Sequence, residues 1–343
     1  MEYSLWQWKI CLEEKMADKI ELKKATKKVT LIKSVFLSEK IGLIAALLVV
    51  MVVFIILTDG NFISYNNIIN ILIMSSIVGM VVIGECYLLI TSHVDLSPGS
   101  VAAFSGVLVA LLLRNGMPLL PAILIVVAIG LCVGVINSLL VNLLKFEAFI
   151  ATLATMSIFR GLAFIICEGK AVFITNANFL KLGSGRIMGI PIPVIIFLVS
   201  FITFMVLLDR TRFGRSVYMV GGNTTAARLA GLNAQTLRTK LYMITSGFAA
   251  LGGVIQTGRM SSGQPMTSEG LEFNAITAVV LGGVAMAGGR GTLSGALIGL
   301  FIMQSFNNGL MMLNIPSFWQ TVSRGLLLIA ALSIDYIRSR SKK

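Results

Sequence analysis

The residues that come nearest to a phosphate-binding site lie in a glycine-rich run, 282–295, with the sequence GGVAMAGGRGTLSG. A nucleotide-binding P-loop requires GxxxxGK[ST], in which the lysine reaches the phosphates and the hydroxyl residue holds magnesium. Gly283 and Gly288 have the right spacing, but Gly289 and Arg290 stand where Lys and Ser/Thr are needed. We therefore reject nucleotide binding here. If the protein uses ATP, another chain must hydrolyse it.

No other motif indicates catalysis or a bound metal. The sequence contains no HExxH motif, no GxSxG motif and no Ser/His/Asp cluster. Its single histidine, His93, excludes a multi-histidine metal centre. The four scattered cysteines form no CxxC pair, so they support neither a zinc site nor a disulfide framework. We therefore expect a protein that is not an enzyme and that requires neither a metal nor a cofactor.

The composition is that of a membrane protein. Hydrophobic residues make up 56% of the chain and charged residues only 13%, against about 25% charged in a typical soluble domain. The net charge of +13 is concentrated in the first forty residues, in segment 209–240 and at the C-terminus. Short cytosolic segments of membrane proteins carry this excess of Lys and Arg. The charge therefore indicates topology and a surrounding lipid membrane, and it does not indicate nucleic-acid binding.

The apolar runs predict an all-α, polytopic protein, since a helix needs about 20 apolar residues to cross a bilayer. We expect about ten spans, some of them short: 41–58, 66–91, 98–113, 118–143, 149–167, 190–208, 239–258, 271–286, 293–313 and 317–334. The lysine-rich N-terminus places both termini in the cytosol. The short runs 98–113 and 271–286 are candidates for re-entrant or broken helices. Outer segments then contain four basic exceptions: Lys170, Lys181, Arg186 and Arg259.

Three parts follow from this count. Residues 1–40 form a charged cytosolic segment, 41–335 a transmembrane domain, and 336–343 a basic cytosolic tail. Inside the transmembrane domain, small residues recur four apart at Gly130 and Gly134 and again at 291, 295 and 299. This spacing lets helix backbones approach closely in lipid. We interpret it as packing within one subunit, with a dimer seam as the alternative.

A polar, basic segment, 209–240, interrupts the apolar sequence on the cytosolic side. It holds six Lys or Arg and one acid. Asn223 or Thr224 can cap a short helix that Gly231 ends, and Asn233 can cap a second helix over 234–240. Topology signalling alone would explain the charge. The two predicted helices indicate in addition a contact surface for a cytosolic partner.

Ionisable residues inside the predicted spans are candidates for function. Glu85, Arg160 and Arg324 each cost on the order of 2.5–3.5 kcal/mol to insert, so they should face a partner or a watery cavity. Structural pairing and substrate contact both remain open. The segment SHVDLSPGS, 92–100, precedes a span. Ser97 suits an N-cap, and the charge of Asp95 suits a helix start; a role in the pathway or in switching is the alternative.

The outer segment 259–273, RMSSGQPMTSEGLEF, is polar and contains Gln264. It suits a loop followed by a helix start. The functional alternative is an outer gate or a docking surface for an extracytoplasmic partner.

From about Asn61 onward the chain resembles the permease subunits of bacterial ABC importers of ribose, arabinose and galactose. The resemblance rests on DLSPGS, FIATLATMSIFRGLAFIICEGKAV, RTRFGRSVYMVGGNTTAARLAGLN, and RMSSGQPMTSEGLEFNAITAVVLGGVAMAGGRGTLSGALIG. TLATMSIFRGLAFIICEGKAV and RMSSGQPMTS are most similar to the L-arabinose type, whereas the ribose type tends to have AQPTAG in place of GQPMTS. The chain departs from the family at Ser92-His93-Val94, where Gly-Gly-Ile is common.

The resemblance implies a homodimer or pseudo-dimer in the bacterial cytoplasmic membrane. It also implies a partner ATPase with two nucleotide sites and an extracytoplasmic sugar-binding protein. The implied substrate is a pentose, L-arabinose first, with ribose or galactose as other possibilities. By the same resemblance, segment 221–240 holds the coupling helices that seat in the ATPase, with Gly221, Asn223, Arg228, Gly231 and Asn233 as coupling residues. Candidates for translocation or gating are Glu85, Asp95, Ser97, Arg160 and Gln264.

An ion-coupled secondary transporter of small polar solutes is the rival hypothesis. Such a protein needs coupling carboxylates in the membrane and often contains an inverted repeat. Glu85 is one candidate carboxylate, and internal repetition in the sequence is faint. A membrane enzyme is a more distant third, because no catalytic constellation supports it.

Overall fold

The computed structural model describes residues 39–341. These residues divide into two units, with the boundary between Ala46 and Leu47. The described part of the first unit is the start of one helix, and the account of packing below concerns the second unit alone. The predicted cytosolic segment 1–40 therefore falls outside the described residues, apart from its last two positions. The helices of the described chain are α2 (Glu39–Leu57), α3 (Tyr65–Ile90), α4 (Pro98–Arg114), α5 (Leu119–Asn142), α6 (Ala148–Ile166), α7 (Ala177–Ser184), α8 (Ile192–Arg210), α9 (Arg212–Gly222), α10 (Thr224–Leu229), α11 (Ala234–Met260), α12 (Leu271–Leu281), α13 (Leu293–Met312) and α14 (Ser317–Ser341).

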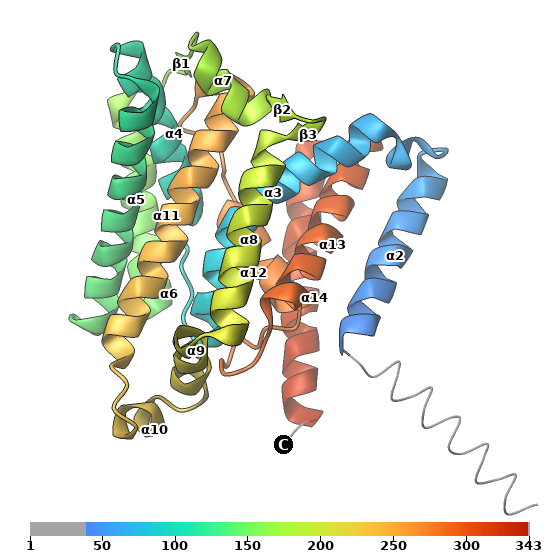
Figure 1. Cartoon of the computed structure of the whole chain (residues 1–343). Helices are drawn as coiled ribbons and strands as arrows, with labels where there is room; N and C mark the ends of the chain where they lie inside the picture. Colours follow the sequence, from blue (N-terminus) through green and yellow to red (C-terminus); the bar gives the residue numbers. More distant parts are fainter. Residues whose placement is uncertain (1–38, 342–343) are drawn as a thin grey trace, which may run out of the picture. The chain divides into compact units, whose positions relative to one another are not determined.

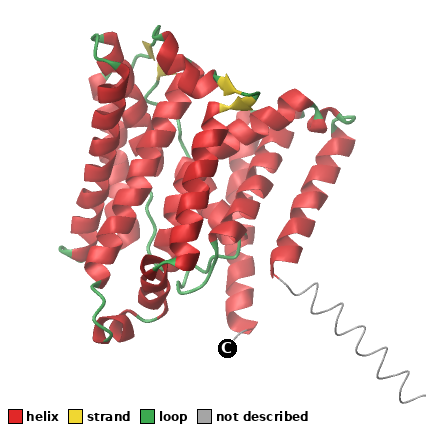
Figure 2. Ribbon diagram, viewed as in Figure 1, coloured by secondary structure: helices red, strands yellow, loops and turns green. Residues whose placement is uncertain are grey.

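Helices dominate the described residues, as the apolar runs predict (Figure 2). A short 3-10 helix, η1 (Asn61–Ile63), precedes α3. The strands are two residues each: β1 (Val172–Phe173) pairs antiparallel with β4 (Ser262–Gly263), and β2 (Arg186–Ile187) with β3 (Ile190–Pro191). These small pairings only tie loops together at one end of the helices (Figure 1). The all-α prediction is therefore confirmed for the described part of the chain.

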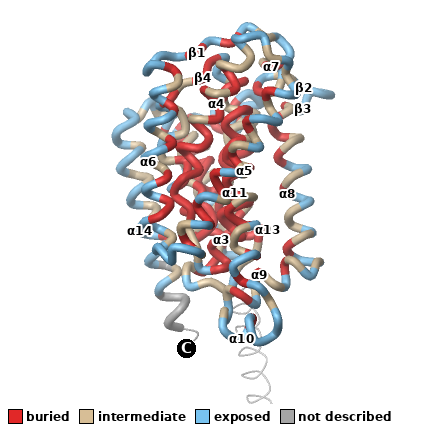
Figure 3. The backbone as a smooth tube through the Cα atoms, turned by 90° about the vertical axis from the view of Figure 1, so that its left-hand side faces the viewer, coloured by how far each residue is buried: buried red, intermediate tan, exposed pale blue. Residues whose placement is uncertain are grey.

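Helices α3, α4 and α11 form the buried centre of the second unit (Figure 3). Helix α11 runs antiparallel to α3, because Gly252 lies beside Ile77 while Gly84 lies beside Thr245. It runs parallel to α4, where Gly253 lies against Ala102. The outer helices instead expose large apolar side chains, such as those of α5, α6 and α8. Such apolar surfaces suit the hydrocarbon core of a lipid bilayer. The helical form suits it as well, because each helix satisfies its own backbone hydrogen-bonding groups.

The two short predicted spans form α4 and α12, which are each continuous and are each preceded by a non-helical segment, so neither helix is itself broken. Helix α4 follows the non-helical segment 91–97, and α12 follows segment 261–270, in which only Ser262 and Gly263 form a strand. Asp95 and Ser97 in the first segment are fully buried. Non-helical backbone at membrane depth is tolerated only where protein covers it or where it lines a watery cavity. The second helix ends at Leu281, so residues 282–286 do not belong to it, contrary to the predicted span.

The number of spans remains a prediction. Among the described residues, four helices are long and apolar enough to cross a membrane, namely α3, α5, α6 and α8. Shorter apolar helices cover 41–57, α4 and α12. Helix α14 continues to Ser341, so the helix extends into the predicted tail 336–343. Such an arrangement fits a polytopic membrane protein.

The spaced glycines pack helices of the same chain together. Gly130 and Gly134 on α5 lie against Ala250 and Met243 of α11, where a side chain would clash. Gly299 on α13 lies equally close to Ala278 of α12. Small residues allow this approach. The interpretation as packing within one subunit is therefore confirmed for these positions.

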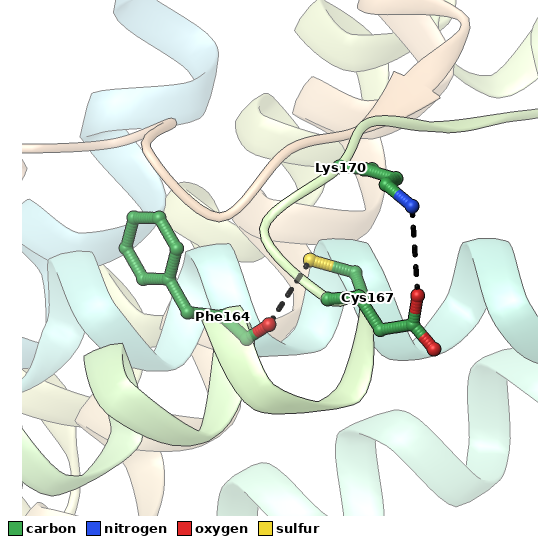
Figure 4. Close-up of polar contacts among 4 residues, drawn as sticks. Phe164, Cys167 and Lys170 are labelled. Atoms are coloured by element: carbon green, nitrogen blue, oxygen red, sulfur yellow. Dashed lines mark hydrogen bonds and ion pairs between the residues drawn. The ribbon is translucent and has the colours of Figure 1, made fainter.

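One basic exception in the outer segments, Lys170, has an acidic neighbour. Helix α6 ends in a turn where the Cys167 thiol donates to the carbonyl of Phe164, and the Nζ of Lys170 lies 3.6 Å from Glu168 Oε2 (Figure 4). Both charged side chains are largely exposed, so the ion pair adds little stability. Because the rule for cytosolic segments counts Lys and Arg and not net charge, Lys170 remains an exception and the topology stays a prediction.

Candidate functional site

The polar segment 209–240 folds into three helical pieces rather than two short helices. Helix α9, which was not predicted, is capped by Thr211, whose Oγ1 accepts from the Gly214 N–H at 3.3 Å. Asn223 caps α10 through the Ala226 N–H, and Asn233 caps α11 through the Thr236 N–H, both at 3.0 Å. Both asparagine caps are as predicted. The predicted short helix over 234–240 is wrong, because these residues are the first turns of α11.

Gly231 ends α10 by the mechanism that the sequence predicts. Its φ of 82° lies in the left-handed region, which glycine adopts without a steric penalty. The N–H of Leu232 donates to the carbonyl of Ala227, and the N–H of Gly231 to that of Arg228, each at 3.0 Å. This pair of bonds is a Schellman motif, which satisfies the last carbonyls of the helix. A helix-ending turn at this position is therefore confirmed.

A hollow of about 440 Å³ opens between α10 and the start of α11. Polar side chains from both helices line it: Thr224, Arg228, Asn233, Gln235 and Arg238, together with residues 231, 232 and 234. Leu229, the last residue of α10, is 86% exposed next to this hollow. Leu229 is the only large apolar side chain of α10, whose sequence is TTAARL, and this is the signal in the sequence that could have marked it. A basic hollow flanked by a bare leucine is a surface suited to a protein partner.

Helix α9 links this surface to the buried core. Gly221, near its end, lies against the carbonyl oxygen of Ile90, the last residue of α3, with no space for a side chain. The same carbonyl accepts the Gly289 N–H at 2.8 Å. The Tyr218 hydroxyl donates to the Gly291 carbonyl at 2.8 Å, and the Ser92 hydroxyl donates to that of residue 287 at 2.7 Å. The end of α3, the end of α9 and loop 282–292 therefore form one hydrogen-bonded junction.

A second polar group lies inside the core, where segment 91–97 meets α5. The Asp95 carboxylate accepts from the Ser97 N–H at 2.8 Å and from the Ser97 hydroxyl at 2.7 Å. Asn137 of α5 donates to both oxygens of Asp95, at 3.3 and 3.2 Å, and to Ser97 Oγ at 2.9 Å. Ser97 therefore precedes α4 as predicted, but its hydroxyl binds Asp95 and caps no N–H of the helix.

Glu85 and Arg160 do not pair with each other. The Glu85 carboxyl group is fully buried on α3, within hydrogen-bonding reach of the backbone of Asp95. The charges that act on it come from Asp95 and Glu272, which are both acids. Arg160 instead donates to the carbonyl oxygens of residues 265 and 267, at 2.6 and 2.8 Å. Its observed role is to hold the segment that leads into α12.

Gln264 lies in this same segment. Its Nε2 donates to Ser262 Oγ at 3.0 Å, and its carbonyl accepts the Thr267 hydroxyl at 2.7 Å. These bonds build the turn that brings the chain from α11 to α12. Gln264 lines neither of the two cavities nearby, and its gating role stays a prediction.

Two cavities adjoin the start of α12. One, of about 360 Å³, lies among α3, α11, α12, α13 and α14 and is rich in Asn and Gln. The other, of about 880 Å³, is lined by residues of α6, α12 and α14 and by the segment before α12. Glu269 and Arg324 line both cavities. Arg324 can be singled out from the sequence as a charge in a span, but the amides cannot, because they converge from five helices only in three dimensions.

The apolar helices and the capped polar surface are those of a polytopic membrane protein with a surface suited to a protein partner. Among the described residues, no group of three His, Cys, Asp or Glu side chains can hold a metal ion. The chain belongs to the family described as "Branched-chain amino acid transport system / permease component", which it matches over residues 67–332. This family and the apolar helices place it in the bacterial cytoplasmic membrane.

The similarity to individual relatives covers most of this chain and most of each relative. The ribose import permease protein RbsC of Bacillus subtilis is 38% identical over 85% of this chain and 91% of its own. The L-arabinose ABC transporter permease protein AraH of Azospirillum brasilense is 37% identical over 84% and 85%. The L-arabinose transport system permease protein AraH of Escherichia coli is 38% identical over 82% and 86%. No solved structure gives a significant match. The predicted family, that of ABC sugar-import permeases, is confirmed.

Proposed function

We propose that this chain is the membrane path of an ATP-driven importer that passes a pentose from an extracytoplasmic binding protein into the cytosol. Two copies of the chain would form the path, and a partner ATPase with two nucleotide sites would drive it. The observation that carries this proposal is the junction between Gly221 of α9 and Ile90 of α3. It connects a surface suited to a protein partner with the buried backbone that precedes α4.

The mechanism follows from this connection. A ligand or partner shifts a conformational equilibrium only if it binds the two states differently. Closure of the ATPase around ATP would pull on α10 and α9, and the contact with Ile90 would carry the movement to segment 91–97. The bonds from Asn137 and Ser97 to Asp95 would let segment 91–97 and α4 move together with α5. The path would then alternate between outward and inward access.

We propose the following roles for the five coupling residues that the resemblance implies. Asn223 and Asn233 fix the ends of α10 and α11 by capping, and Gly231 sets the angle between these helices. Arg228 lines the hollow and offers a positive charge to the partner. Gly221 provides the close contact with α3. We propose that these five residues couple ATP hydrolysis to movement of the core.

We propose L-arabinose as the first substrate to test and ribose as the second. Relatives named for each of these sugars have similar identity to this chain, and both sugars are pentoses. The segment RMSSGQPMTS favours the arabinose type. High affinity and most of the selectivity would reside in the binding protein, so the path itself needs to hold the sugar only weakly.

An ion-coupled transporter remains the second candidate, on one observation. Glu85 is a fully buried acid on a membrane-spanning helix, next to the backbone of a second buried acid, Asp95. Ion-coupled transporters use acids near the middle of the membrane. The two candidates differ in their source of energy, so they are separated by experiment.

The experiment uses the full chain in lipid nanodiscs together with the candidate ATPase and sugar-binding protein of the importer. ATP hydrolysis is measured with the binding protein loaded with L-arabinose, ribose, galactose or no sugar. We expect one pentose-loaded form to raise hydrolysis severalfold above the sugar-free form. If no sugar changes hydrolysis in an assembled complex, the proposed function is wrong.

A further inference from the structure

The cavity of about 360 Å³ lies among five helices of the second unit and is lined by seven Asn and Gln side chains. Its residues come from early turns of α3 and α14 and from late turns of α11 and α13, which lie at the end opposite α10 (Figure 1). In the predicted topology this is the extracytoplasmic half. Binding sites for small molecules typically measure about 300–1,000 Å³, so a monosaccharide fits the available volume.

Several polar atoms at this cavity are unpaired. Oε1 of Gln256, Oδ1 of Asn274 and Oδ1 of Asn307 are buried with no hydrogen-bond partner among the described residues, and so is Nε of Arg324. These four atoms belong to α11, α12, α13 and α14 respectively. Leaving a buried donor or acceptor unpaired costs stability, and natural proteins rarely do so without a reason. A ligand that offers both donors and acceptors would satisfy all four atoms.

The chemistry of the lining selects among such ligands. A sugar hydroxyl donates one hydrogen bond and accepts others, so it pairs with an amide oxygen and equally with an amide or guanidinium N–H. Apolar side chains, including Ile71, Met74 and Met311, complete the walls and suit the C–H faces of a sugar ring. The charged lining groups are Arg259, Arg324 and Glu269. Seven amides and one acid beside two bases favour an uncharged, hydroxyl-rich ligand over an anion.

One pair of amides fixes the geometry of the cavity. Asn308 on α13 and Asn67 on α3 exchange two hydrogen bonds, each 2.9 Å long. Asn67 also donates to the Phe62 carbonyl at 2.7 Å. This paired amide bridge holds α3 against α13 while the neighbouring Asn307 keeps an unpaired oxygen. The cavity therefore has a braced wall as well as free binding groups.

We propose that this cavity is a sugar-binding site of the permease itself, in which a pentose binds transiently after it leaves the binding protein. Gln256, Asn274, Asn307 and Arg324 bind its hydroxyl groups. This proposal rests on the proposed function and adds the place and the chemistry of the intermediate stop. Affinity is low, because a tight stop in mid-path would slow release.

The test uses the full chain in nanodiscs and tritiated L-arabinose and ribose. The variant Asn274→Leu/Asn307→Leu removes two amides while keeping similar side-chain volume, and Gln256→Met does the same for a third. Direct binding is followed by saturation-transfer NMR at millimolar sugar, and uptake by proteoliposomes that also contain the ATPase and the binding protein. We expect the double variant to lower binding and uptake by at least about tenfold, since each lost hydrogen bond weakens binding by roughly three- to tenfold.

The matched control is Asn66→Leu, an exposed amide on the first turn of α3 outside the cavity. It should bind and import the sugar as the wild type does. Thermal unfolding and co-purification with the ATPase exclude misfolding, and Gln256→Met alone decides the question if the double variant does not assemble. Wild-type binding and uptake in correctly assembled cavity variants would overturn this inference and leave the proposed function intact. If the assembled wild type imports no sugar, the proposed function itself fails.

Discussion

Gly221, near the end of α9, lies directly against the carbonyl oxygen of Ile90, the last residue of α3. The two residues, at positions 90 and 221, are 131 positions apart in the sequence. One belongs to the polar segment predicted to contact an ATPase, and the other immediately precedes the buried segment 91–97. A movement of α9 should therefore also move the end of α3, because the backbones of the two helices are in direct contact.

Substitution of this glycine should uncouple the two regions. Gly221→Ala adds a methyl group where the Ile90 carbonyl already lies, and overpacking of this kind costs about 1–3 kcal/mol. We expect lower thermal stability and at least a tenfold loss of uptake. Gly222→Ala is the matched control, because no atom lies within 4 Å of its added methyl group. Equal behaviour of the two variants would contradict a role for this contact.

The surface around α10 should decide association with the ATPase. Leu229 is 86% exposed, and burial of a leucine at an interface contributes about 1.5–3 kcal/mol. We expect Leu229→Asp to weaken co-purification with the ATPase by about tenfold or more. Arg228→Glu should act in the same direction by reversing a charge at the hollow.

Arg215→Glu provides the charge-matched control for that experiment, since Arg215 is exposed on α9 and does not line the hollow. It should retain association. If Arg228→Glu and Leu229→Asp both bind the ATPase with wild-type affinity, then α10 is not the contact.

The Asp95 network should matter for stability. Asn137→Leu leaves the Asp95 carboxylate without its donor from α5, and the loss of a partner for a buried charged group costs on the order of 1–3 kcal/mol. Thermal unfolding in detergent should show a midpoint several degrees lower. The comparison variant is Asn142→Leu, because Asn142 is on the same helix but is only half-buried. It should have the smaller effect.

Packing of α5 on α11 supplies a further prediction. Gly134→Ala forces a methyl group into the backbone of Met243, so we expect a loss of about 1–3 kcal/mol in the free energy of unfolding. Gly161→Ala on α6 has open space around the new methyl group and should be neutral. Chemical denaturation in mixed micelles measures both. A neutral Gly134→Ala would show that the helices do not pack as closely as described.

Local signals in the sequence predict local structure well at the polar segment. Asn223, Asn233 and Gly231 each have a side chain or a backbone freedom that acts within a few residues, and each does what its type predicts. Helix α9 was not predicted, because its glycines at positions 221 and 222 are typical of a turn. The structure gives a reason for one of them, because only a glycine at position 221 leaves room for the carbonyl oxygen of Ile90.

Long-range relationships could not be predicted in this way. Ser97 has the residue type of an N-cap, yet its hydroxyl binds Asp95, because Asn137 from another helix holds that carboxylate in place. Arg160 has the type of an ion-pair partner for Glu85, yet it binds backbone carbonyls 105 and 107 residues away. The amide-lined cavity depends on the packing of five helices, which no short pattern encodes.

The central claim is that ATP, and not an ion gradient, drives sugar through this chain. The most direct measurement is uptake of tritiated L-arabinose and ribose by proteoliposomes that contain the full chain with its ATPase, with the binding protein added outside and ion gradients collapsed by ionophores. The account predicts uptake of one of these pentoses only when ATP is enclosed and all three proteins are present. Uptake by the chain alone that follows an imposed ion gradient and ignores ATP would contradict it.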